Sequence, residues 1–309
     1  MFPFHPGSTR GTNVVLRLTD SRRMLQPAFR LAFLAISALV LLMPHGLAQD
    51  RPRRVASLNL CADQLLLALA DRDQIAALTP LVHDRSISFL ADEAGDLPVE
   101  SQGEALLFRD VDLVLLGRYG TALRQDLLER HGVPVMVLDI WPNLAAGRAE
   151  IRAVAARLGH PDRGEALVGR IDAALARSKD IVRNRPSILP YYRRGWVPAS
   201  DSLTGELLRH MGFALHQDAI GLSRGGELRL ERIVSAPPDY ALMDESTGRS
   251  VDNGSALLVH PALVAAVPPE RRLTIPSRLE ICGGPATPAA IDALAAEVRA
   301  KVKESRGSP

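Results

Sequence analysis

One short segment of this chain concentrates side chains that can hold a ligand. Residues 191–196 read Tyr-Tyr-Arg-Arg-Gly-Trp, although aromatic residues make up only 4% of the sequence. Flat rings can lie against a planar ligand, and arginines can pair with its carboxylate or catecholate groups. We therefore predict that Tyr191, Tyr192, Arg193 and Trp196 contact a ligand. The alternative is that the rings fill the apolar interior of a loop and the arginines are solvated.

Further candidate residues follow apolar runs in the first half of the chain. In an open α/β sheet, ligand contacts come from the loops that follow the strands. Three such loops contain Asn59, His83 and Arg118, and the last of them adds Tyr119. Arg278 is included because it lies near the expected ligand cleft, where arginine can pair with an anionic ligand.

Catalytic chemistry has one candidate, a thiol nucleophile. Cys61 could attack a substrate if its thiol were free, had a lowered pKa and lay within hydrogen-bond reach of His83. The sequence contains no Gly-x-Ser-x-Gly elbow, phosphate-binding loop or Cys-x-x-Cys motif. Its histidines do not have the spacing of a zinc site, so we predict no bound metal and no cofactor.

Short apolar runs alternate with stretches of helical spacing, which is typical of parallel α/β sheets. In the first half of the chain, the runs predicted as buried strands are 55–58, 75–78, 113–116 and 135–138. Helices are predicted over 63–69 and 122–130. A doubly wound sheet of this kind places the polar loops named above at the carboxyl ends of its strands.

A repeat predicts a second, similar sheet. Residues 104–116 align without a gap on residues 231–243, which lie 127 positions later. Each copy begins with Glu, reaches Asp eight positions on and continues as an apolar strand. Further strands are predicted at 187–191 and 273–275. Two similar units predict two similar lobes, and ligands favour the crevice between lobes.

One long amphipathic stretch separates the two halves. Its apolar residues recur with helical spacing from Asp162 to about Asn184. A helix of roughly 22 residues would be about 33 Å long, enough to reach from one lobe to the next. We therefore predict an α/β fold with two doubly wound lobes and a cleft between them. The predicted limits are 49–160 for the first lobe, 161–184 for the spanning helix and 185–309 for the second lobe.

Residues 1–48 have the pattern of a leader rather than of a folded segment. Arg22 and Arg23 precede an apolar run that is too short to span a bilayer, and small residues up to Ala48 suit signal peptidase. The arginine pair leaves a twin-arginine signal open, and Met24 is an alternative start. A cleavable signal peptide predicts export to the periplasm.

The charge pattern argues against nucleic acid as a partner. The formal net charge is +2, and the arginines are dispersed along the chain. A nucleic-acid-binding protein would gather them on one element.

The chain contains two cysteines, Cys61 and Cys282. Two cysteines in an exported chain permit one disulfide but no disulfide framework. We predict separate thiols, because a bridge between the lobes would restrict the access of a large ligand.

These features resemble the solute-binding proteins of ABC importers for metal chelates, which include ferric-siderophore, haem and vitamin B12 binders. The resemblance covers nearly all of residues 53–302, and its short motifs are more specific in their order than singly. The motifs are Arg54-Val-Ala-Ser-Leu-Asn-Leu-Cys-Ala-Asp63, Gly103-Glu104-Ala-Leu-Leu, Asp112-Leu-Val-Leu, Leu230-Glu231-Arg-Ile-Val, Pro238-Asp239 and Cys282-Gly-Gly-Pro285. The resemblance implies a monomeric binding protein without catalytic residues and a spanning helix that permits only small lobe movements.

The resemblance also assigns a role to the glutamate that opens each repeat. Glu104 and Glu231 match the residues with which that family docks onto arginines of the membrane permease. Carboxylates on two lobes can set register and orientation on a partner through charge-assisted pairing. The alternative is that each glutamate only favours the positive amino end of its own helix.

The identity of the ligand stays open between three metal chelates. The arginines near the expected cleft favour an anionic ferric siderophore, because cobalamin has little net charge for arginine to pair with. Haem would use a Tyr or His axial ligand, which Tyr119, Tyr191, Tyr192 and His83 could supply. The alternative from another class is a secreted thiol-dependent α/β hydrolase that uses Cys61 and His83.

Overall fold

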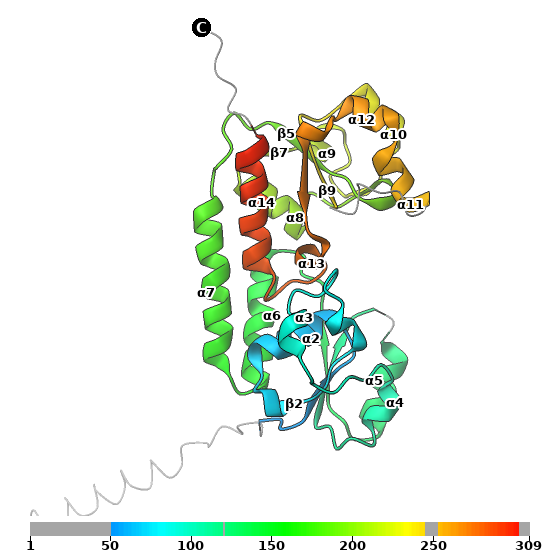
Figure 1. Ribbon diagram of the computed structural model, residues 1–309, viewed down its shortest axis with the longest axis vertical. Coiled ribbons are helices and arrows are strands. Elements are labelled where there is room, and N and C mark those ends of the chain that lie inside the picture. Colours follow the sequence, from blue (N-terminus) through cyan, green and yellow to red (C-terminus); the bar gives the residue numbers. More distant parts are fainter. Residues whose placement is uncertain (1–50, 120, 245–252, 303–309) are drawn as a thin grey trace, which may run out of the picture. The chain divides into compact units, whose positions relative to one another are not determined.

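Two separate parallel sheets organise the chain (Figure 1). The structure, a computed structural model, describes residues 51–119, 121–244 and 253–302. The two sheets confirm the predicted α/β fold class with two lobes. The exact lobe limits at 160 and 185 stay predictions, and the predicted leader, residues 1–48, lies outside the described residues.

The first sheet has the order β2-β1-β3-β4, and all of its strands run parallel. Its strands are those that the apolar runs predict, namely β1 (Val55–Ser57), β2 (Ile75–Ala77), β3 (Leu113–Gly117) and β4 (Val135–Leu138). Alternate side chains of β3 belong to different core clusters. Leu115 packs in the cluster of helix α2 (Leu60–Leu69), and Val114 packs in that of helix α5 (Ala122–Arg130). Helices therefore cover both faces, as in a doubly wound sheet.

The second sheet has the order β10-β9-β5-β7 and is also parallel. Its strands are β5 (Ser187–Pro190), β7 (Ala214–Leu215), β9 (Tyr240–Asp244) and β10 (Arg272–Ile275). Leu242 belongs to the cluster of Leu294, whereas Met243 belongs to the cluster of Leu263. The second lobe also contains a small antiparallel pair, β6 (Trp196–Val197) and β8 (Gly226–Glu227). In the sequence, β6 lies between β5 and β7, and β8 lies between β7 and β9.

The two copies of the repeat have the same structural role in their sheets. Asp112 stands before β3 and accepts hydrogen bonds from the backbone N–H of Arg53 (2.7 Å) and Arg54 (3.1 Å). Asp239 stands before β9 and accepts hydrogen bonds from the backbone N–H (2.7 Å) and hydroxyl (2.8 Å) of Ser187. Each aspartate thus holds the start of the neighbouring strand, β1 or β5, against the strand that it precedes.

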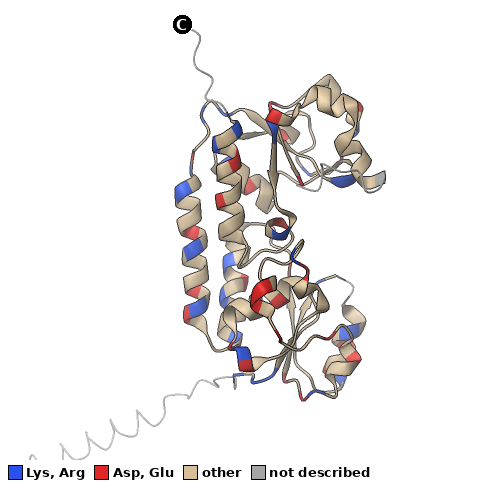
Figure 2. Ribbon diagram, in the orientation of Figure 1, with Lys and Arg blue, Asp and Glu red and all other residues tan. Residues whose placement is uncertain are grey.

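Three long helices pack beside the sheets: α6 (Leu144–Arg157), α7 (Pro161–Ser178) and α14 (Thr287–Lys301). Helix α7 leads from the first sheet to the second and packs against both α6 and α14 (Figure 1). Its apolar face is buried, and all of its charged residues lie outside that face. Acidic and basic residues follow each other along the helix (Figure 2). Acidic and basic residues are likewise spread over both lobes rather than gathered on one element.

Helix α7 is shorter than the sequence predicts, because it ends at Ser178 instead of Asn184. Backbone N–H groups beyond Ser178 donate instead to carbonyls at the end of helix α8 (Leu203–His210). Asp180 donates to His210 (3.0 Å), and Val182 donates to Met211 (2.9 Å). With 18 residues, α7 is roughly 27 Å long. Tertiary hydrogen bonds, which the local pattern does not reveal, therefore set its end.

The remaining α-helices within the described residues are short. They are α2 (Leu60–Leu69), α3 (Ala91–Ala94), α4 (Gly103–Leu106), α5 (Ala122–Arg130), α8 (Leu203–His210), α9 (His216–Ala219), α10 (Leu230–Ser235), α11 (Asn253–Ala256), α12 (Pro261–Ala266) and α13 (Ser277–Glu280). One apolar core cluster contains strands of both sheets together with α7 and α14. The two lobes are thus joined by packed side chains as well as by the chain itself.

Candidate functional site

A disulfide joins the two lobes beside the carboxyl ends of their strands. Cys61 lies in the first turn of α2, where the Asn59 side chain accepts the Cys61 N–H at 2.9 Å and fixes the start of the helix. Cys282 follows α13, and its Cα lies 5.1 Å from that of Cys61. The prediction of separate thiols is therefore wrong. Each cysteine lines one of two cavities, so the bridge is part of the cavity wall.

The disulfide also removes the basis of the hydrolase alternative. Both cysteines of the chain are in the bridge, so Cys61 has no thiol to ionise. His83 lies exposed at the end of the 3-10 turn Pro80–His83 and lines neither of the two cavities. The thiol–imidazole pair that the hydrolase alternative requires is thus not formed.

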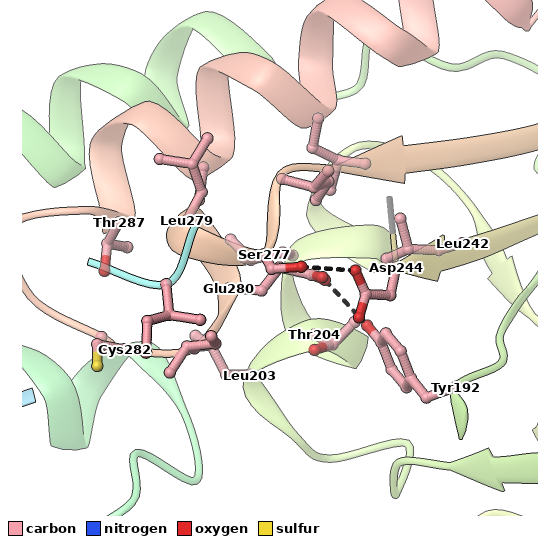
Figure 3. Close-up of a pocket in the computed structure, with 17 residues that line it drawn as sticks. Tyr192, Leu203, Thr204, Leu242, Asp244, Ser277, Leu279, Glu280, Cys282 and Thr287 are labelled. Atoms are coloured by element: carbon pink, nitrogen blue, oxygen red, sulfur yellow. Dashed lines mark hydrogen bonds between the residues drawn. The ribbon is translucent and has the colours of Figure 1, made fainter. Parts of the chain in front are cut away.

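The first cavity, which we call the apolar cavity, has a volume of 530 Å³ (Figure 3). Its wall comes mainly from β9, β10, α8, α13 and α14 of the second lobe, with Ile87 from the first. The apolar part of the wall includes Leu203, Leu207, Leu242 and Leu279. Polar side chains gather at one end of the cavity, and they are Tyr192, Thr204, Asp244, Ser277 and Glu280.

Two hydrogen bonds organise this polar end (Figure 3). The Tyr192 hydroxyl donates to Glu280 Oε1 at 3.2 Å, and the Ser277 hydroxyl donates to Asp244 Oδ1 at 2.7 Å. The fold brings them together because Asp244 ends β9, while Ser277 and Glu280 belong to α13, directly after β10. The carboxyl ends of neighbouring parallel strands therefore supply this part of the cavity.

Burial changes the protonation behaviour of this group. Burial, and then the charge of Asp244, raises the pKa of Glu280 from 4.5 to about 7, although the Tyr192 hydrogen bond opposes the change. Burial, followed by the neighbouring Glu280 carboxylate, raises the pKa of Tyr192 well above its usual value of 10. Tyr192 therefore stays a neutral hydrogen-bond donor near pH 7.

The second cavity, which we call the cleft cavity, has a volume of 420 Å³ and is lined from both lobes. It shares Leu203, Thr204, Glu280, Ile281 and Gly283 with the apolar cavity, so the two adjoin. Three predicted residues, Asn59, Arg118 and Tyr119, meet in its wall. Of these, Tyr119 has 75% of its side chain exposed.

The charge of Arg118 is already paired within the protein. Its Nε donates to Asp139 Oδ1 at 2.6 Å, and its terminal nitrogen donates to the second Asp139 oxygen. This pairing raises the pKa of Arg118 and lowers that of Asp139. Trp141 lines the same cavity and donates from Nε1 to Glu150 Oε1 at 2.8 Å. Arg118 therefore offers an incoming anion less uncompensated positive charge than an unpaired guanidinium would.

The aromatic and basic segment at 191–196 divides between different surroundings. Tyr192 lines the apolar cavity, but Tyr191 is fully buried elsewhere and donates to the Leu228 carbonyl at 3.2 Å. Adjacent residues in an extended chain point to opposite sides, which explains the division. Arg193 and Trp196 are exposed and line neither cavity. The exposed Arg278 side chain, on α13, likewise lines neither.

The sequence reasoning missed the two carboxylates of the apolar cavity, Asp244 and Glu280. Asp244 is the residue that follows the repeat, and it corresponds to Gly117 of the first lobe. Both end their strands, and Gly117 lines the cleft cavity. Extending the repeat by one position would have identified Asp244. Glu280 carried no such signal, because its neighbour Tyr192 lies 88 positions away in the sequence.

The two glutamates that open the repeats lie away from these cavities. Glu104 is exposed on α4 before β3, and Glu231 is exposed on α10 before β9. Neither lines the apolar or the cleft cavity. A role in docking stays a prediction.

Two further properties apply to the part of the chain that the structure describes. No group of three or more His, Cys, Asp or Glu side chains there is arranged to hold a metal ion. No helix in the same residues has the length and apolarity needed to cross a membrane.

Comparison with known proteins gives a family match and several structural likenesses. The family described as periplasmic binding protein matches residues 55–279. No curated protein matches the sequence.

Among solved structures, a periplasmic haem-binding protein from Roseiflexus sp. RS-1 is 23% identical, with a TM-score of 0.64 over 80% of this chain and 97% of its own. A periplasmic haem-binding protein from Pseudomonas aeruginosa is 20% identical, with a TM-score of 0.62 over 82% and 94%. A periplasmic vitamin B12 binding protein from Vibrio cholerae is 15% identical, with a TM-score of 0.57 over 82% and 99%. At these identities the likeness concerns the fold.

Proposed function

The chain belongs to the periplasmic binding protein family, and from this premise we propose that it captures a metal chelate and delivers it to an ABC importer. The observation that carries the proposal is the pair of adjoining cavities at the carboxyl ends of strands from both sheets. Cavities of about 300–1,000 Å³ are typical of sites for small ligands. The proposed role is binding and transfer, without a catalytic step.

For the ligand we propose a ferric siderophore, with haem or cobalamin as alternatives. The apolar wall around Leu203, Leu207 and Leu242 suits the organic shell of a chelate. The structural neighbours named above bind haem or vitamin B12, which supports a ligand of this size and kind. The predicted arginines give the siderophore little support. Arg118 is paired with Asp139, and neither Arg193 nor Arg278 lines a cavity.

For the partner we propose a permease of the inner membrane, contacted through Glu104 and Glu231. Both carboxylates are exposed and stand at equivalent places in the two copies of the repeat. Such carboxylates can pair with arginines of a partner without contributing to the ligand cavities. We further propose that the protein works as a monomer in the periplasm after removal of residues 1–48.

Fluorescence titration of residues 49–309 tests the ligand. Trp141 lines the cleft cavity and has 9% of its side chain exposed, whereas Trp196 lies outside both cavities. A bound chelate should quench Trp141 saturably, and Trp196→Phe should leave that quenching in place. A ferric siderophore, haem and cobalamin are the probes.

A pair of arginine substitutions supplies the control. Leu203→Arg places a cation in the wall shared by both cavities, whereas Leu123→Arg changes a side chain that is 85% exposed. Only Leu203→Arg should weaken binding. If none of the three chelates quenches the fluorescence saturably, the proposed function is wrong.

A further inference from the structure

The wall of the apolar cavity follows two helices of the second lobe. Thr287, Ala290 and Leu294 line it from α14, at spacings of three and four residues that place them on one face. The seven residue steps from Thr287 to Leu294 cover about 10 Å along the helix axis. Leu203 and Leu207, four positions apart on α8, line the cavity from a second helix face. The wall therefore extends over about two turns of one helix and one turn of another.

Much of this wall is aliphatic. Ile275 of β10 and Leu279 of α13 join the leucines of α8 and α14. Figure 3 shows Leu279 and Thr287 to one side of the hydrogen-bonded polar group. Aliphatic side chains offer water no hydrogen-bond partner, and a water molecule needs two to four polar partners to be held in a cavity. This part of the cavity therefore favours an apolar group of a ligand over water.

The polar end of the cavity does not oppose an apolar occupant. Tyr192 donates to Glu280, and Ser277 donates to Asp244, so these side chains bond to one another. A hydrocarbon that lies along the aliphatic wall leaves both hydrogen bonds in place. It therefore avoids the cost of a buried polar group that has lost its partner.

The adjoining cleft cavity has a different character. Its wall includes the polar or charged side chains Asn59, Arg118, Asp139 and Glu150. Ile281 lines both cavities and is 48% exposed, so an apolar side chain stands where the two spaces adjoin. A ligand that fills both cavities is accordingly polar in one part and apolar in the other.

We infer that the protein binds an amphiphilic metal chelate, with the metal centre in the cleft cavity and a linear acyl chain in the apolar cavity. The inference rests on the proposed function, because it assigns one part of the proposed chelate. A flexible chain suits this wall better than the edge of a macrocycle does. Flat rings gain most from aromatic faces, and Tyr192 is the one aromatic residue among the described lining of the apolar cavity.

A series of ferric trihydroxamates that differ only in a linear N-acyl chain tests the inference. The chains are acetyl, butanoyl, hexanoyl and octanoyl, and the readout is fluorescence titration of residues 49–309. Each added methylene should tighten binding by up to about fourfold, since burial of one CH₂ contributes about 0.8 kcal/mol. Calorimetry should give a heat-capacity change of binding that becomes more negative along the series. Octanoate without the chelate should bind far more weakly, because it leaves the cleft cavity unfilled.

Substitutions on one helix locate the chain. Ala290 is half-buried and lines the apolar cavity, so Ala290→Phe places a ring in the space proposed for the chain. This variant should reduce the gain per methylene and keep the affinity for the acetyl chelate within about threefold. Ala296→Phe, the same change at an exposed position of α14, is the matched control and should keep the full gain. Circular dichroism checks that the variants are folded. Ala290→Leu, a smaller addition that should reduce the gain less, supplies the test if the larger ring prevents folding.

The outcomes separate the inference from the proposed function. Equal affinity along the series would overturn the inference and leave chelate binding intact. An undiminished gain per methylene in the folded Ala290 variants, or octanoate binding as tightly as the octanoyl chelate, would overturn it as well. Binding of haem or cobalamin without binding of any trihydroxamate would contradict the inference and support the proposed function. If no chelate binds at all, the proposed function falls and the inference falls with it.

Discussion

The two lobes agree at the amino ends of their strands and differ at the carboxyl ends. Asp112 and Asp239 make matching hydrogen bonds to the starts of β1 and β5. At the other end, the first lobe has Gly117 followed by an arginine, whereas the second lobe ends β9 with Asp244. The repeat thus keeps its scaffold where strands begin and varies its chemistry where ligands bind.

The largest effect is expected from the two glutamates that occupy equivalent places in the lobes, Glu104 and Glu231. Reversing both charges, Glu104→Arg with Glu231→Arg, should abolish uptake of the chelate through the permease and leave ligand affinity unchanged. The reason is that two repelled contacts would prevent correct docking, while neither residue lines a cavity. Radiolabelled iron uptake and fluorescence titration measure the two properties.

Single reversals sharpen the same test. Because the two glutamates occupy equivalent places, each single change should reduce uptake by a similar and smaller amount. The double variant Glu129→Arg with Glu270→Arg, one exposed glutamate from each lobe, is the matched control and should retain uptake. Normal uptake by the Glu104→Arg, Glu231→Arg variant would show that the glutamates only favour the ends of their helices.

Glu280, which follows the last strand of the second lobe, should make the stability of the protein depend on pH. The folded-state pKa of Glu280, about 7, lies above the usual 4.5. Its contribution to the free energy of unfolding is therefore fully present below pH 4.5 and is lost as the pH rises through 7. The difference between these pKa values limits the loss to about 3 kcal/mol.

Glu280→Gln should remove this loss, so urea unfolding of the variant should change less between pH 5 and pH 8 than that of the wild type. Asp63 in the first lobe remains as an internal reference, because burial raises its pKa from 3.8 to about 6. It should still cause a decrease in stability as the pH rises through 6. An unchanged wild-type profile in the Glu280→Gln protein would contradict the prediction.

Substitutions at the amino ends of the strands should have smaller effects, of similar size in the two lobes. Asp112→Ala and Asp239→Ala should each lower the free energy of unfolding by roughly 1 kcal/mol, because each removes hydrogen bonds to the start of a strand. Urea denaturation measures both. Asp92→Ala, which removes a solvated ion pair with Arg85, is the control and should cost less than either. A large difference between the two aspartates would mean that the copies are not equivalent.

The smallest effect is expected at the paired cation of the first lobe. Arg118→Gln should change chelate affinity by no more than about threefold, because Asp139 already satisfies the guanidinium. Glu280→Gln should have a larger effect on the same titration, because Glu280 lines both cavities. If Arg118→Gln were the more damaging of the two, the first lobe would dominate ligand recognition.

Local sequence patterns predict the strands and the repeat because their causes are local. Continuous apolar runs such as Leu113–Leu116 are buried on both faces, and an aspartate that precedes a strand can reach the neighbouring strand. The end of α7 at Ser178 is different, because carbonyls of His210 and Met211 attract the N–H groups that follow. The local sequence around residue 180 does not indicate these tertiary hydrogen bonds.

The site was predictable only in part for the same reason. Asn59, Arg118 and Tyr119 follow strands of one sheet, so topology alone brings them to one cavity. The contact of Tyr192 with Glu280 and the pairing of Cys61 with Cys282 join residues 88 and 221 positions apart. The first contact depends on packing within the second lobe and the second on how the two lobes face each other, and one sequence specifies neither.

The Cys61–Cys282 bridge turns an open chain into a ring with two covalent routes between the lobes. One route runs through the segment that follows α7, and the other runs through the sulfur atoms. A cut within residues 179–186 would leave the two lobes covalently linked until a reductant was added. The bridge therefore adds, to the packed core and the chain itself, a second covalent restraint on lobe separation.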